Sequence, residues 1–370
     1  MDAGYRSIGA KRMSEGESIE IRELFKIFGS SPAKYIDAIK SGLSKPELQR
    51  LYGQVLGLNN ISISMPAGKI QVIMGLSGSG KSTLIRHINR LIEPTSGSIV
   101  IHGRDILKMK ELELRQFRRN RTAMVFQKFA LLPHRTVIGN VIFGLELRGI
   151  EKAKARDVGM GWIERVGLHG FDARYPHELS GGMQQRVGLA RALSNDASIL
   201  LMDEAYSALD PLIRTDMQTM LLDLQSELKK TIVFITHDLD EALRLGDRIV
   251  ILRDGSVVQQ GDSQDIVLRP ADDYIARFVK DVNRGRVIKV DAVMQPAPQN
   301  VDGSLPQIRS GATLEAAAKA LTDSAFDKAI VTDGASRPIG AITLRLVTAS
   351  LSSNPEAQLE AAQAAAAAGA

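Results

Sequence analysis

The sequence predicts an α/β protein in which a mostly parallel sheet, with helices on its faces, is followed by a small second α/β module. Two features lead to this prediction. Between Ile61 and Val258, short runs rich in β-branched and apolar residues alternate with helical segments, and such alternation is typical of parallel sheets. From Arg284 onward, a proline-containing stretch precedes only one helix and two strands. The expected strands of the main domain are residues 70–74, 98–101, 123–126, 199–202, 232–235 and 248–252.

The first strand-like segment is 19–24, so we expect residues 1–18 to form a disordered leader and the main domain to span 19–283. An amphipathic stretch at about 29–57 interrupts this domain soon after the strand. Ser44 and Glu47 in it have capping-box spacing, which predicts an inserted helix at the domain's edge. The residues that follow at first-turn or helical positions are Pro46, Leu48, Leu51, Tyr52 and Val55.

The C-terminal region, 284–352, is expected to comprise a linker and a small α/β module. Its proline-containing linker runs through Pro298, and an alanine-rich tail of low complexity follows the module at 353–370. The elements expected in the module are a helix at 313–321, a strand at 328–331, a turn at 333–334 and a strand at 339–343.

Composition limits the classes of function. The 370 residues are 44% hydrophobic and 24% charged, enough for one large domain and a smaller one, and the chain has no cysteine. No apolar run approaches the roughly 20 residues that cross a bilayer, and no secretory signal opens the chain, so we expect it in the cytoplasm. The net charge of +5 permits an anionic partner. Without zinc spacing, a recognition-helix pattern or an aromatic-basic box, we expect no nucleic-acid partner.

A glycine-rich loop between the 70–74 strand and a helix starting near Lys81 fits the GxxxxGK[ST] pattern. Its backbone N–H groups would surround phosphate oxygens, and the helix N-terminus adds about half a positive charge. Lys81 would bridge the terminal phosphates of ATP, and the Ser82 hydroxyl would ligate Mg²⁺. A plain surface turn is the alternative, which the strand and helix context disfavours. The predicted nucleotide-binding residues are Gly75, Ser77, Gly78, Ser79, Gly80, Lys81, Ser82 and Thr83.

A second set of candidate residues follows the buried 199–202 strand. Asp203 and Glu204 come at its C-terminal end, where open α/β sheets bind ligands. We expect Asp203 to hold magnesium and Glu204 to polarise the attacking water. Such a pair is often only a solvated turn, but its pairing with a phosphate loop favours the catalytic interpretation.

The stretch 179–184, LSGGMQ, lies between the phosphate loop and the carboxylate pair. In this position it resembles the signature loop of ABC ATPases. The resemblance implies a P-loop NTPase fold of the ABC type, with an antiparallel β subdomain and a helical signature subdomain. It also implies a homodimer in which Ser180, Gly181 and Gly182 contact the γ-phosphate bound by the opposite subunit.

The other elements of the ABC pattern appear in order. Gln127 matches the Q-loop glutamine that approaches magnesium and water, and residues 207–210, SALD, match the D-loop that ends at Asp210. His237 matches the switch histidine that contacts the γ-phosphate. Phe28 is the candidate aromatic for stacking on adenine. Each of these residues also has a purely structural interpretation: Gln127 as a polar strand end, His237 as a helix cap and Phe28 as a core residue. Because all of the elements occur in the order of the ABC pattern, the family's functional roles are favoured.

The resemblance covers about residues 19–279 and narrows to ATPases of quaternary-amine importers, which carry glycine betaine, proline or choline. The insertion after Phe28 and the stretches 74–80, 127–134 and 202–214 carry this narrower resemblance. Residues 291–351 resemble one cystathionine-β-synthase-type repeat (CBS-type repeat), whereas family members often carry two.

The family resemblance implies partners that the chain itself lacks. These are membrane permease subunits and a periplasmic or lipid-anchored substrate-binding protein acting through them, which would place the chain at the cytoplasmic face of the inner membrane. A soluble ABC ATPase acting on translation or DNA is the alternative. Such proteins usually join two ATPase domains or contain long coiled coils, and neither feature occurs here. A P-loop kinase would have no use for the signature loop.

Overall fold

The computed structural model describes residues 15–297, 304–324 and 326–351. The chain divides into two compact units, Met1–Gln260 and Gly261–Ala370. The division lies earlier than the expected boundary at 283, so the segment from Gly261 to residue 283 groups with the C-terminal unit.

The larger unit is built on a six-stranded sheet in the order β10-β9-β3-β8-β7-β6. The ladders joining β9, β3, β8, β7 and β6 are all parallel. Continuous apolar runs form these strands because both faces of a parallel sheet are covered. The strands are β3 (Ile70–Met74), β6 (Thr122–Phe126), β7 (Ile199–Asp203), β8 (Thr231–Thr236), β9 (Arg248–Arg253) and β10 (Ser256–Gly261).

A second sheet of the same unit is antiparallel, in the order β2-β1-β4-β5. It corrects one expectation, because the run at 98–101 belongs to β4 of this sheet and not to the parallel one. The first strand also runs longer than the expected 19–24. The bounds are β1 (Ile19–Phe28), β2 (Val55–Met65), β4 (Ser96–Ile101) and β5 (Arg104–Asp105).

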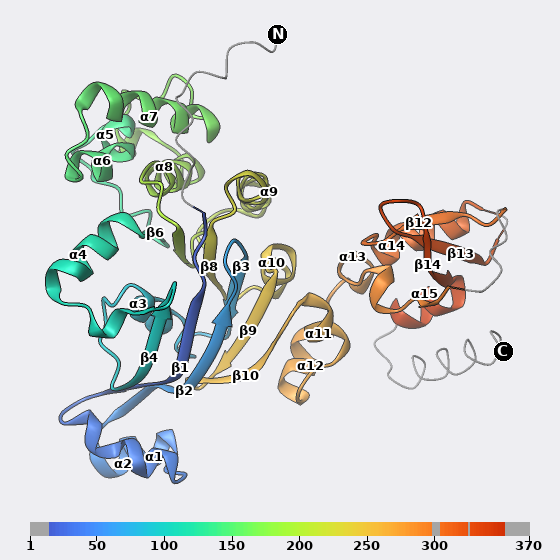
Figure 1. Ribbon diagram of the computed structural model, residues 1–370, viewed down its shortest axis with the longest axis horizontal. Coiled ribbons are helices and arrows are strands. Elements are labelled where there is room, and N and C mark those ends of the chain that lie inside the picture. The colour runs from blue at the N-terminus through green and yellow to red at the C-terminus, as the bar shows by residue number, and fades with distance from the viewer. Residues whose placement is uncertain (1–14, 298–303, 325, 352–370) are drawn as a thin grey trace. The chain divides into compact units, whose positions relative to one another are not determined.

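One apolar core joins the two sheets. It includes Ile21 of β1, Leu84 of α3 and Ile235 of β8, all at most 1% exposed. Figure 1 shows helices α5 to α8 gathered at one end of this unit and the inserted helices α1 and α2 at the other. The helices are α3 (Lys81–Ile88), α4 (Glu111–Asn120), α5 (Val137–Val141), α6 (Phe143–Leu147), α7 (Lys152–Arg165), α8 (Gly181–Ser194), α9 (Pro211–Leu228) and α10 (Leu239–Leu245), with 3-10 turns at Ile106–Lys108 and Pro176–Glu178.

The inserted segment contains a 3-10 helix (Pro32–Tyr35), α1 (Ile36–Lys40) and α2 (Lys45–Tyr52), not one helix. The predicted capping box is present, since the Ser44 N–H donates to Glu47 Oε2 at 3.0 Å and the Glu47 N–H donates to Ser44 Oγ at 3.4 Å. Leu48, Leu51 and Tyr52 lie in α2 as expected, and the helical pattern fails only at Val55, because α2 ends at Tyr52. Leu51 is 53% exposed, and Val55 belongs to β2.

The expected disordered leader is partly wrong. Residues 1–14 lie outside the described residues, but Glu17 is 8% exposed and forms an ion pair with Arg121. The Thr231 hydroxyl donates to the Glu17 carbonyl at 2.8 Å. The strand that follows is therefore anchored before its first residue.

The C-terminal unit contains a four-stranded sheet in the order β11-β14-β13-β12. The predicted helix and two strands are confirmed as α14, β13 and β14, and Thr313 caps α14 by accepting from the Ala316 N–H. The elements are α11 (Ser263–Leu268), α12 (Asp273–Val279), α13 (Arg284–Val287), a 3-10 turn (Val290–Ala292), β11 (Gln295–Pro296), β12 (Gln307–Arg309), α14 (Leu314–Thr322), β13 (Lys328–Thr332), β14 (Pro338–Thr343) and α15 (Leu344–Leu351).

The segment from Arg284 to Pro298 is not the free linker that was expected. Ile288 and Val290 are fully buried, and the Val290 N–H donates to the Ala312 carbonyl at 2.9 Å. Strand β11 then pairs with β14. The tail at 353–370 and residue 298 lie outside the described residues.

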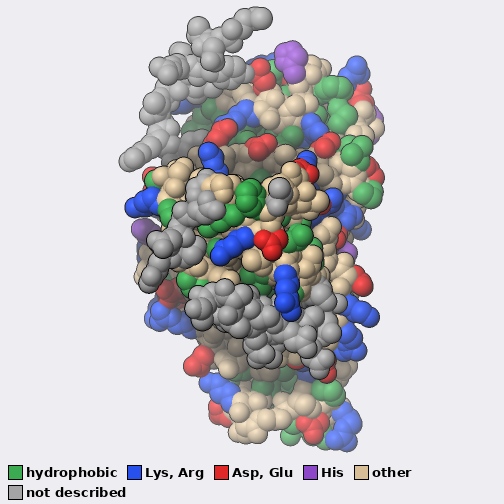
Figure 2. Space-filling view, turned by 90° about the vertical axis from the view of Figure 1, so that its right-hand side faces the viewer, with side chains coloured by type: hydrophobic (Ala, Val, Ile, Leu, Met, Phe, Trp, Pro, Cys, Tyr) green, Lys and Arg blue, Asp and Glu red, His purple; other side chains and the backbone are tan. Residues whose placement is uncertain are grey.

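The surface carries both signs of charge. On the face shown in Figure 2, blue Lys and Arg side chains and red Asp and Glu side chains are interspersed among the described residues. Within the described part of the chain, no helix has the length and apolar character that crossing a membrane requires.

Candidate functional site

The predicted phosphate loop joins β3 to α3 and has a backbone that only glycine accommodates easily. Gly78 and Gly80 have φ values of 79° and 102°, in the left-handed region. A Cβ on Gly80 would lie 2.8 Å from the Gly57 carbonyl oxygen. The loop therefore turns tightly against β2 and ends where α3 begins at Lys81, so the first N–H groups of the helix point back toward the loop.

Lys81 is 4% exposed and lies beneath this loop. Its Nζ donates to the carbonyls of Gly75, at 2.7 Å, and Leu76, at 3.0 Å. The neighbouring Ser82 Oγ donates to Asp203 Oδ1 at 2.8 Å. The structure thus brings the phosphate loop and the end of β7 together, although 121 residues separate Ser82 from Asp203.

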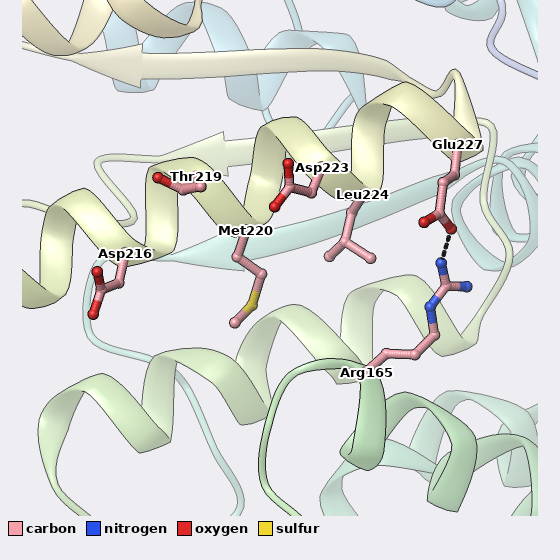
Figure 3. A pocket seen from close by; sticks show the side chains of 7 residues that line it. All are labelled: Arg165, Asp216, Thr219, Met220, Asp223, Leu224 and Glu227. Atoms are coloured by element: carbon pink, nitrogen blue, oxygen red, sulfur yellow. Dashed lines mark hydrogen bonds and ion pairs between the residues drawn. The ribbon is translucent and has the colours of Figure 1, made fainter. Parts of the chain in front are cut away.

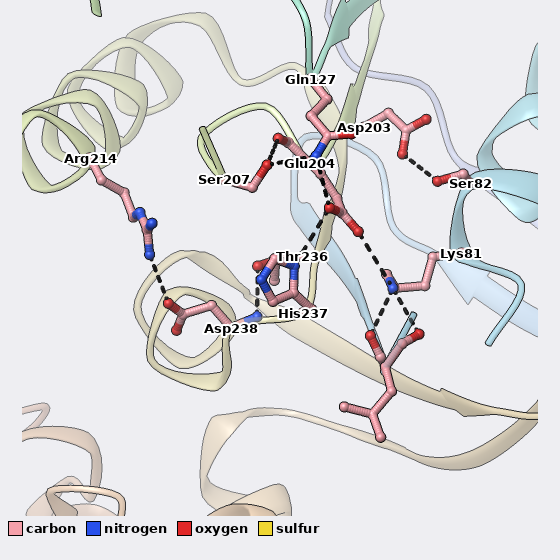
Figure 4. A network of polar contacts seen from close by, with 12 residues as sticks. Lys81, Ser82, Gln127, Asp203, Glu204, Ser207, Arg214, Thr236, His237 and Asp238 are labelled. Carbon is pink, nitrogen blue, oxygen red and sulfur yellow. Dashed lines mark hydrogen bonds and ion pairs between the residues drawn. The ribbon is translucent and has the colours of Figure 1, made fainter. Parts of the chain in front are cut away.

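Glu204 is at the centre of the polar groups shown in Figure 4. Its Oε1 lies 3.6 Å from Lys81 Nζ, and its Oε2 lies 3.5 Å from His237 Nδ1. Gln127 Nε2 donates to the same Oε2 at 3.4 Å and to Ser207 Oγ at 3.1 Å. Glu204 has a φ of 47°, an uncommon value for a residue with a side chain. Three predicted residues from distant segments, Lys81, Gln127 and His237, therefore meet around the carboxylate of a fourth, Glu204.

A pocket of about 300 Å³ lies between this site and the antiparallel sheet. Phe28, which is 39% exposed, forms part of its wall. The inserted segment contributes Lys45, which sequence reasoning missed. The capping box placed Lys45 at the start of a helix but gave no sign of its direction. The lining residues are Phe28, Lys45, Val55, Leu56, Gly57, Ser77, Gly78, Gly80, Lys81, Ser82, Thr83 and Glu204.

The signature residues do not line this pocket. Ser180 is the N-cap of α8, where its hydroxyl accepts from the Met183 N–H at 3.4 Å. Gly182 has no room for a side chain, since a Cβ would lie 2.6 Å from Ile213 Cγ2. Asp210 caps α9 by accepting from the Ile213 N–H at 3.1 Å. The four predicted residues Ser180, Gly181, Gly182 and Asp210 are thus separate from the phosphate loop of their own chain.

Sequence reasoning also missed Arg191 of α8. It donates to the carbonyls of Phe129, at 3.1 Å, and Ala130, at 2.7 Å. Burial lowers the pKa of this guanidinium. Phe129 and Ala130 have φ values of 52° and 49°, so the turn after Gln127 is held in an unusual conformation by the helix that Ser180 caps. No motif marks Arg191, because its contact depends on tertiary packing.

The residues present fit ATP and Mg²⁺. The buried Ser79 hydroxyl has no hydrogen-bond partner. Two backbone carbonyls of the loop, those of Gly75 and Leu76, accept hydrogen bonds from the Lys81 ammonium group. Ser82 and Asp203 offer the oxygen ligands that magnesium prefers. No group of three or more His, Asp or Glu side chains among the described residues could hold a metal ion. Magnesium commonly keeps water and phosphate oxygens as its remaining ligands, so this small donor set suffices.

A second hollow, of about 430 Å³, lies along α9 and is shown in Figure 3. None of the residues predicted for nucleotide binding lines it. An ion pair between Arg165 of α7 and Glu227 of α9 closes one end. The lining residues are Arg165, Asp216, Thr219, Met220, Asp223, Leu224 and Glu227.

Comparison with known proteins decides the family. Residues 58–207 match the model of the ABC transporter family. The glycine betaine transport ATP-binding protein OpuAA of Bacillus subtilis is 52% identical over 75% of this chain and 67% of that protein. The glycine betaine/proline betaine transport system ATP-binding protein ProV of Escherichia coli is 46% identical over 88% of this chain and 80% of that protein. The chain belongs to the ABC transporter family.

Solved structures agree with this assignment. The ATP-binding cassette MJ0796, in a dimeric post-hydrolysis state bound to ADP and Pi, superposes with a TM-score of 0.56. It is 30% identical and covers 66% of this chain and 98% of its own. As an ABC ATP-binding subunit, this chain binds nucleotide and is an ATPase, and the predicted ABC fold is confirmed.

Proposed function

We propose that this ABC ATPase hydrolyses ATP to drive uptake of a quaternary-amine osmolyte, of the glycine betaine, proline or choline class, through a separate membrane permease. The names of OpuAA and ProV support this substrate class. The observation that carries the catalytic part is the meeting of Lys81, Gln127 and His237 around Glu204. The permease would in turn receive solute from a periplasmic or lipid-anchored substrate-binding protein.

Each residue of the site has a role that its position supports. Lys81 and the loop N–H groups bind the phosphates, and Ser82 with Asp203 would hold Mg²⁺, which neutralises phosphate charge when bound. Glu204 orients and activates the attacking water. Gln127 and His237 face the same carboxylate, so both can position that water and the γ-phosphate. Because Glu204 is only 20% exposed, its interactions are less screened than on an open surface.

We propose that the active form is a homodimer. Ser180, Gly181 and Gly182 do not line their own chain's pocket, whereas Gly181 and Ser180 are exposed at the start of α8. The helix start can accept phosphate from a facing subunit. The dimeric state of MJ0796 supports this arrangement. Asp210, at the end of the D-loop, would then link the two nucleotide sites.

The decisive experiment is Glu204→Gln. The change keeps the side-chain volume and the phosphate loop but removes water activation, so hydrolysis should slow by about 10²- to 10⁴-fold while ATP still binds. ATP should then hold the dimer closed, as measured by size-exclusion chromatography with light scattering. Arg165→Ala, at the second hollow, is the matched control and should hydrolyse ATP normally. Parental hydrolysis by the Glu204→Gln protein would contradict the assignment.

Action across the dimer has its own test. Lys81→Ala damages the site of its own chain, whereas Ser180→Arg should damage the site of its partner. A heterodimer of the two variants therefore contains one doubly damaged site and one intact site. About half the parental activity per dimer supports action in trans, and a well-folded heterodimer without an intact site contradicts it.

We propose that residues 129–134 receive the membrane partner and that the chain works at the cytoplasmic face of the inner membrane as a peripheral subunit. This turn follows Gln127 directly, and Arg191 fixes its backbone. A partner's movement there would be passed to the glutamine beside Glu204. Charge substitutions at Leu131 and Leu132 should abolish transport in reconstituted vesicles while isolated ATPase activity survives.

We propose that the module at 291–351 is a single CBS-type repeat. Its order of helix and paired strands, α14, β13 and β14, supports this assignment. A single repeat buries little apolar surface, so pairing with the copy in the other subunit would complete it. The module contributes none of the predicted phosphate or magnesium ligands, which favours a regulatory role.

A further inference from the structure

Arg214, in the first turns of α9, bridges two loops that approach the site. Its Nη2 donates to the carbonyl of Leu209 at 3.3 Å, and its Nη1 donates to Asp238 Oδ2 at 3.1 Å. Leu209 lies in the 207–210 loop, and Asp238 directly follows His237. Figure 4 shows this second contact on the side of His237 away from Lys81. One guanidinium thus ties together the D-loop and the loop that bears the switch histidine.

Asp238 is also held in place by hydrogen bonds to neighbouring residues in the sequence. Its Oδ1 accepts from the Glu241 N–H at 3.1 Å as the N-cap of α10, and its own N–H donates to Thr236 Oγ1 at 3.0 Å. The backbone on both sides of His237 is therefore fixed. A shift of Asp238 would move the His237 imidazole, whose Nδ1 is 3.5 Å from Glu204 Oε2.

The charged pair is partly shielded from water. The side chains of Arg214 and Asp238 are 27% and 33% exposed, and Arg214 Nε is buried without a hydrogen-bond partner. Charge-assisted bonds of this kind are shorter and stronger than neutral ones, and a two-pronged guanidinium also fixes direction.

We propose that Arg214 is a positioning residue for ATP hydrolysis, which sets His237 relative to Glu204 and makes that placement depend on the 207–210 loop. This inference rests on the roles proposed above for Glu204 and His237. Because the 207–210 loop is expected at the dimer interface, Arg214 would align His237 only when the two subunits are correctly joined. Displacement of a catalytic group by about 1 Å can cost 10²-fold in rate.

Simple helix packing is the competing explanation, and the same pair of helices supplies its control. Arg244 of α10 donates to Gln218 Oε1 at 2.9 Å and to Thr219 Oγ1 at 2.8 Å, both on α9. Arg244 therefore joins α9 to α10 as Arg214 does, but it has no hydrogen bond to the 207–210 loop or to Asp238. Loss of packing alone should affect the two arginines alike.

The test compares Arg214→Ala, Asp238→Asn, their double variant and Arg244→Ala in the full-length protein. Asparagine caps helices as well as aspartate does, so Asp238→Asn removes only the charge that receives Arg214. We expect each single variant to lower kcat about 10-fold, with the KM for ATP within twofold of the parent. The double variant should be no slower than the slower single one. Arg214→Lys should restore part of the rate, and Arg244→Ala should keep kcat within twofold.

Several results would overturn the inference. Parental kcat in folded Arg214→Ala and Asp238→Asn proteins would do so, as would a double variant slowed by the product of the two single effects. Equal loss of kcat in Arg244→Ala would leave packing as the cause. Glu204→Gln, measured in parallel, separates the two proposals. If it hydrolyses ATP normally the proposed function fails, and if it is inactive while Arg214→Ala is normal only this inference fails.

Discussion

Phe28 should supply much of the affinity for the adenine base. Its ring borders the nucleotide pocket, and Lys26 Nζ lies 4.9 Å from the ring centroid. Stacking of a base on an aromatic side chain contributes about 1–3 kcal/mol. Since Lys26 already covers part of one face of the ring, we expect Phe28→Ala to lose a binding free energy in the lower half of this range. That corresponds to binding about 5- to 30-fold weaker, at about 1.4 kcal/mol for each factor of ten.

Gly57→Ala tests the same ring without removing it. A Cβ at Gly57 would lie 2.6 Å from Phe28 Cε2, so the ring must move by about 0.8 Å to reach an ordinary contact of 3.4 Å. The ring is 39% exposed and can move at little cost to stability. ATP binding should therefore weaken in the Gly57→Ala protein, and the substitution should add little in a Phe28→Ala background.

Isothermal titration calorimetry with a non-hydrolysable ATP analogue measures the change in nucleotide affinity. Inorganic tripolyphosphate is the control ligand, because it needs only the loop around Lys81 and should bind parent and variants equally. Parental affinity of Phe28→Ala for the nucleotide would refute the reasoning. Equal weakening towards tripolyphosphate would show that the pocket itself had been damaged.

Three further predictions address stability, coupling and the C-terminal unit. Burial raises the pKa of Glu241 in the folded protein. Its contribution to stability is therefore complete below about pH 4, near the pKa of the unfolded chain, and is lost as pH rises through the pKa of the folded protein. The unfolding free energy of Glu241→Gln, measured in urea titrations, should thus increase relative to that of the parent between about pH 4 and 7. Arg191→Ala frees the Phe129 and Ala130 carbonyls and should lower transport in reconstituted vesicles more than isolated ATPase activity; equal losses would contradict this. Truncation after Gly261 keeps β10 and every predicted site residue, so a folded protein with ATPase activity within twofold of the parent is expected, and an inactive folded truncate would count against it.

The part of the fold that the sequence reveals is the part governed by local rules. The buried strands β3 and β7 are continuous apolar runs, and the loop at 75–82 has the glycines that its backbone requires. The capping box at Ser44 is likewise local, and it occurs as predicted. The site residues at strand ends meet because parallel strands present the same ends at one edge of the sheet.

The errors share a different cause. The run at 98–101 has the same composition as a parallel strand, but β4 pairs with β1, which lies far away in sequence. The stretch from Arg284 looks like a linker because of its prolines, yet Ile288 and Val290 are buried and their backbones hydrogen-bond to Leu314 and Ala312. Polarity around Glu17 suggested disorder, although long-range contacts to Arg121 and Thr231 fix it. In each case the deciding contact partner is remote in the sequence.

If Glu204 acts as proposed, the arrangement around Lys81 lets this one carboxylate govern both nucleotide binding and hydrolysis. An ammonium group has three donors, and the Gly75 and Leu76 carbonyls take two of them. Glu204 Oε1, 3.6 Å from the same Nζ, is a negative charge close to where the phosphates would lie. In the role proposed for it, Glu204 would oppose the charge of ATP while it activates water. Replacing it by glutamine should remove both effects together, so the slow hydrolysis and the tight nucleotide-bound dimers expected of Glu204→Gln would have a common electrostatic origin.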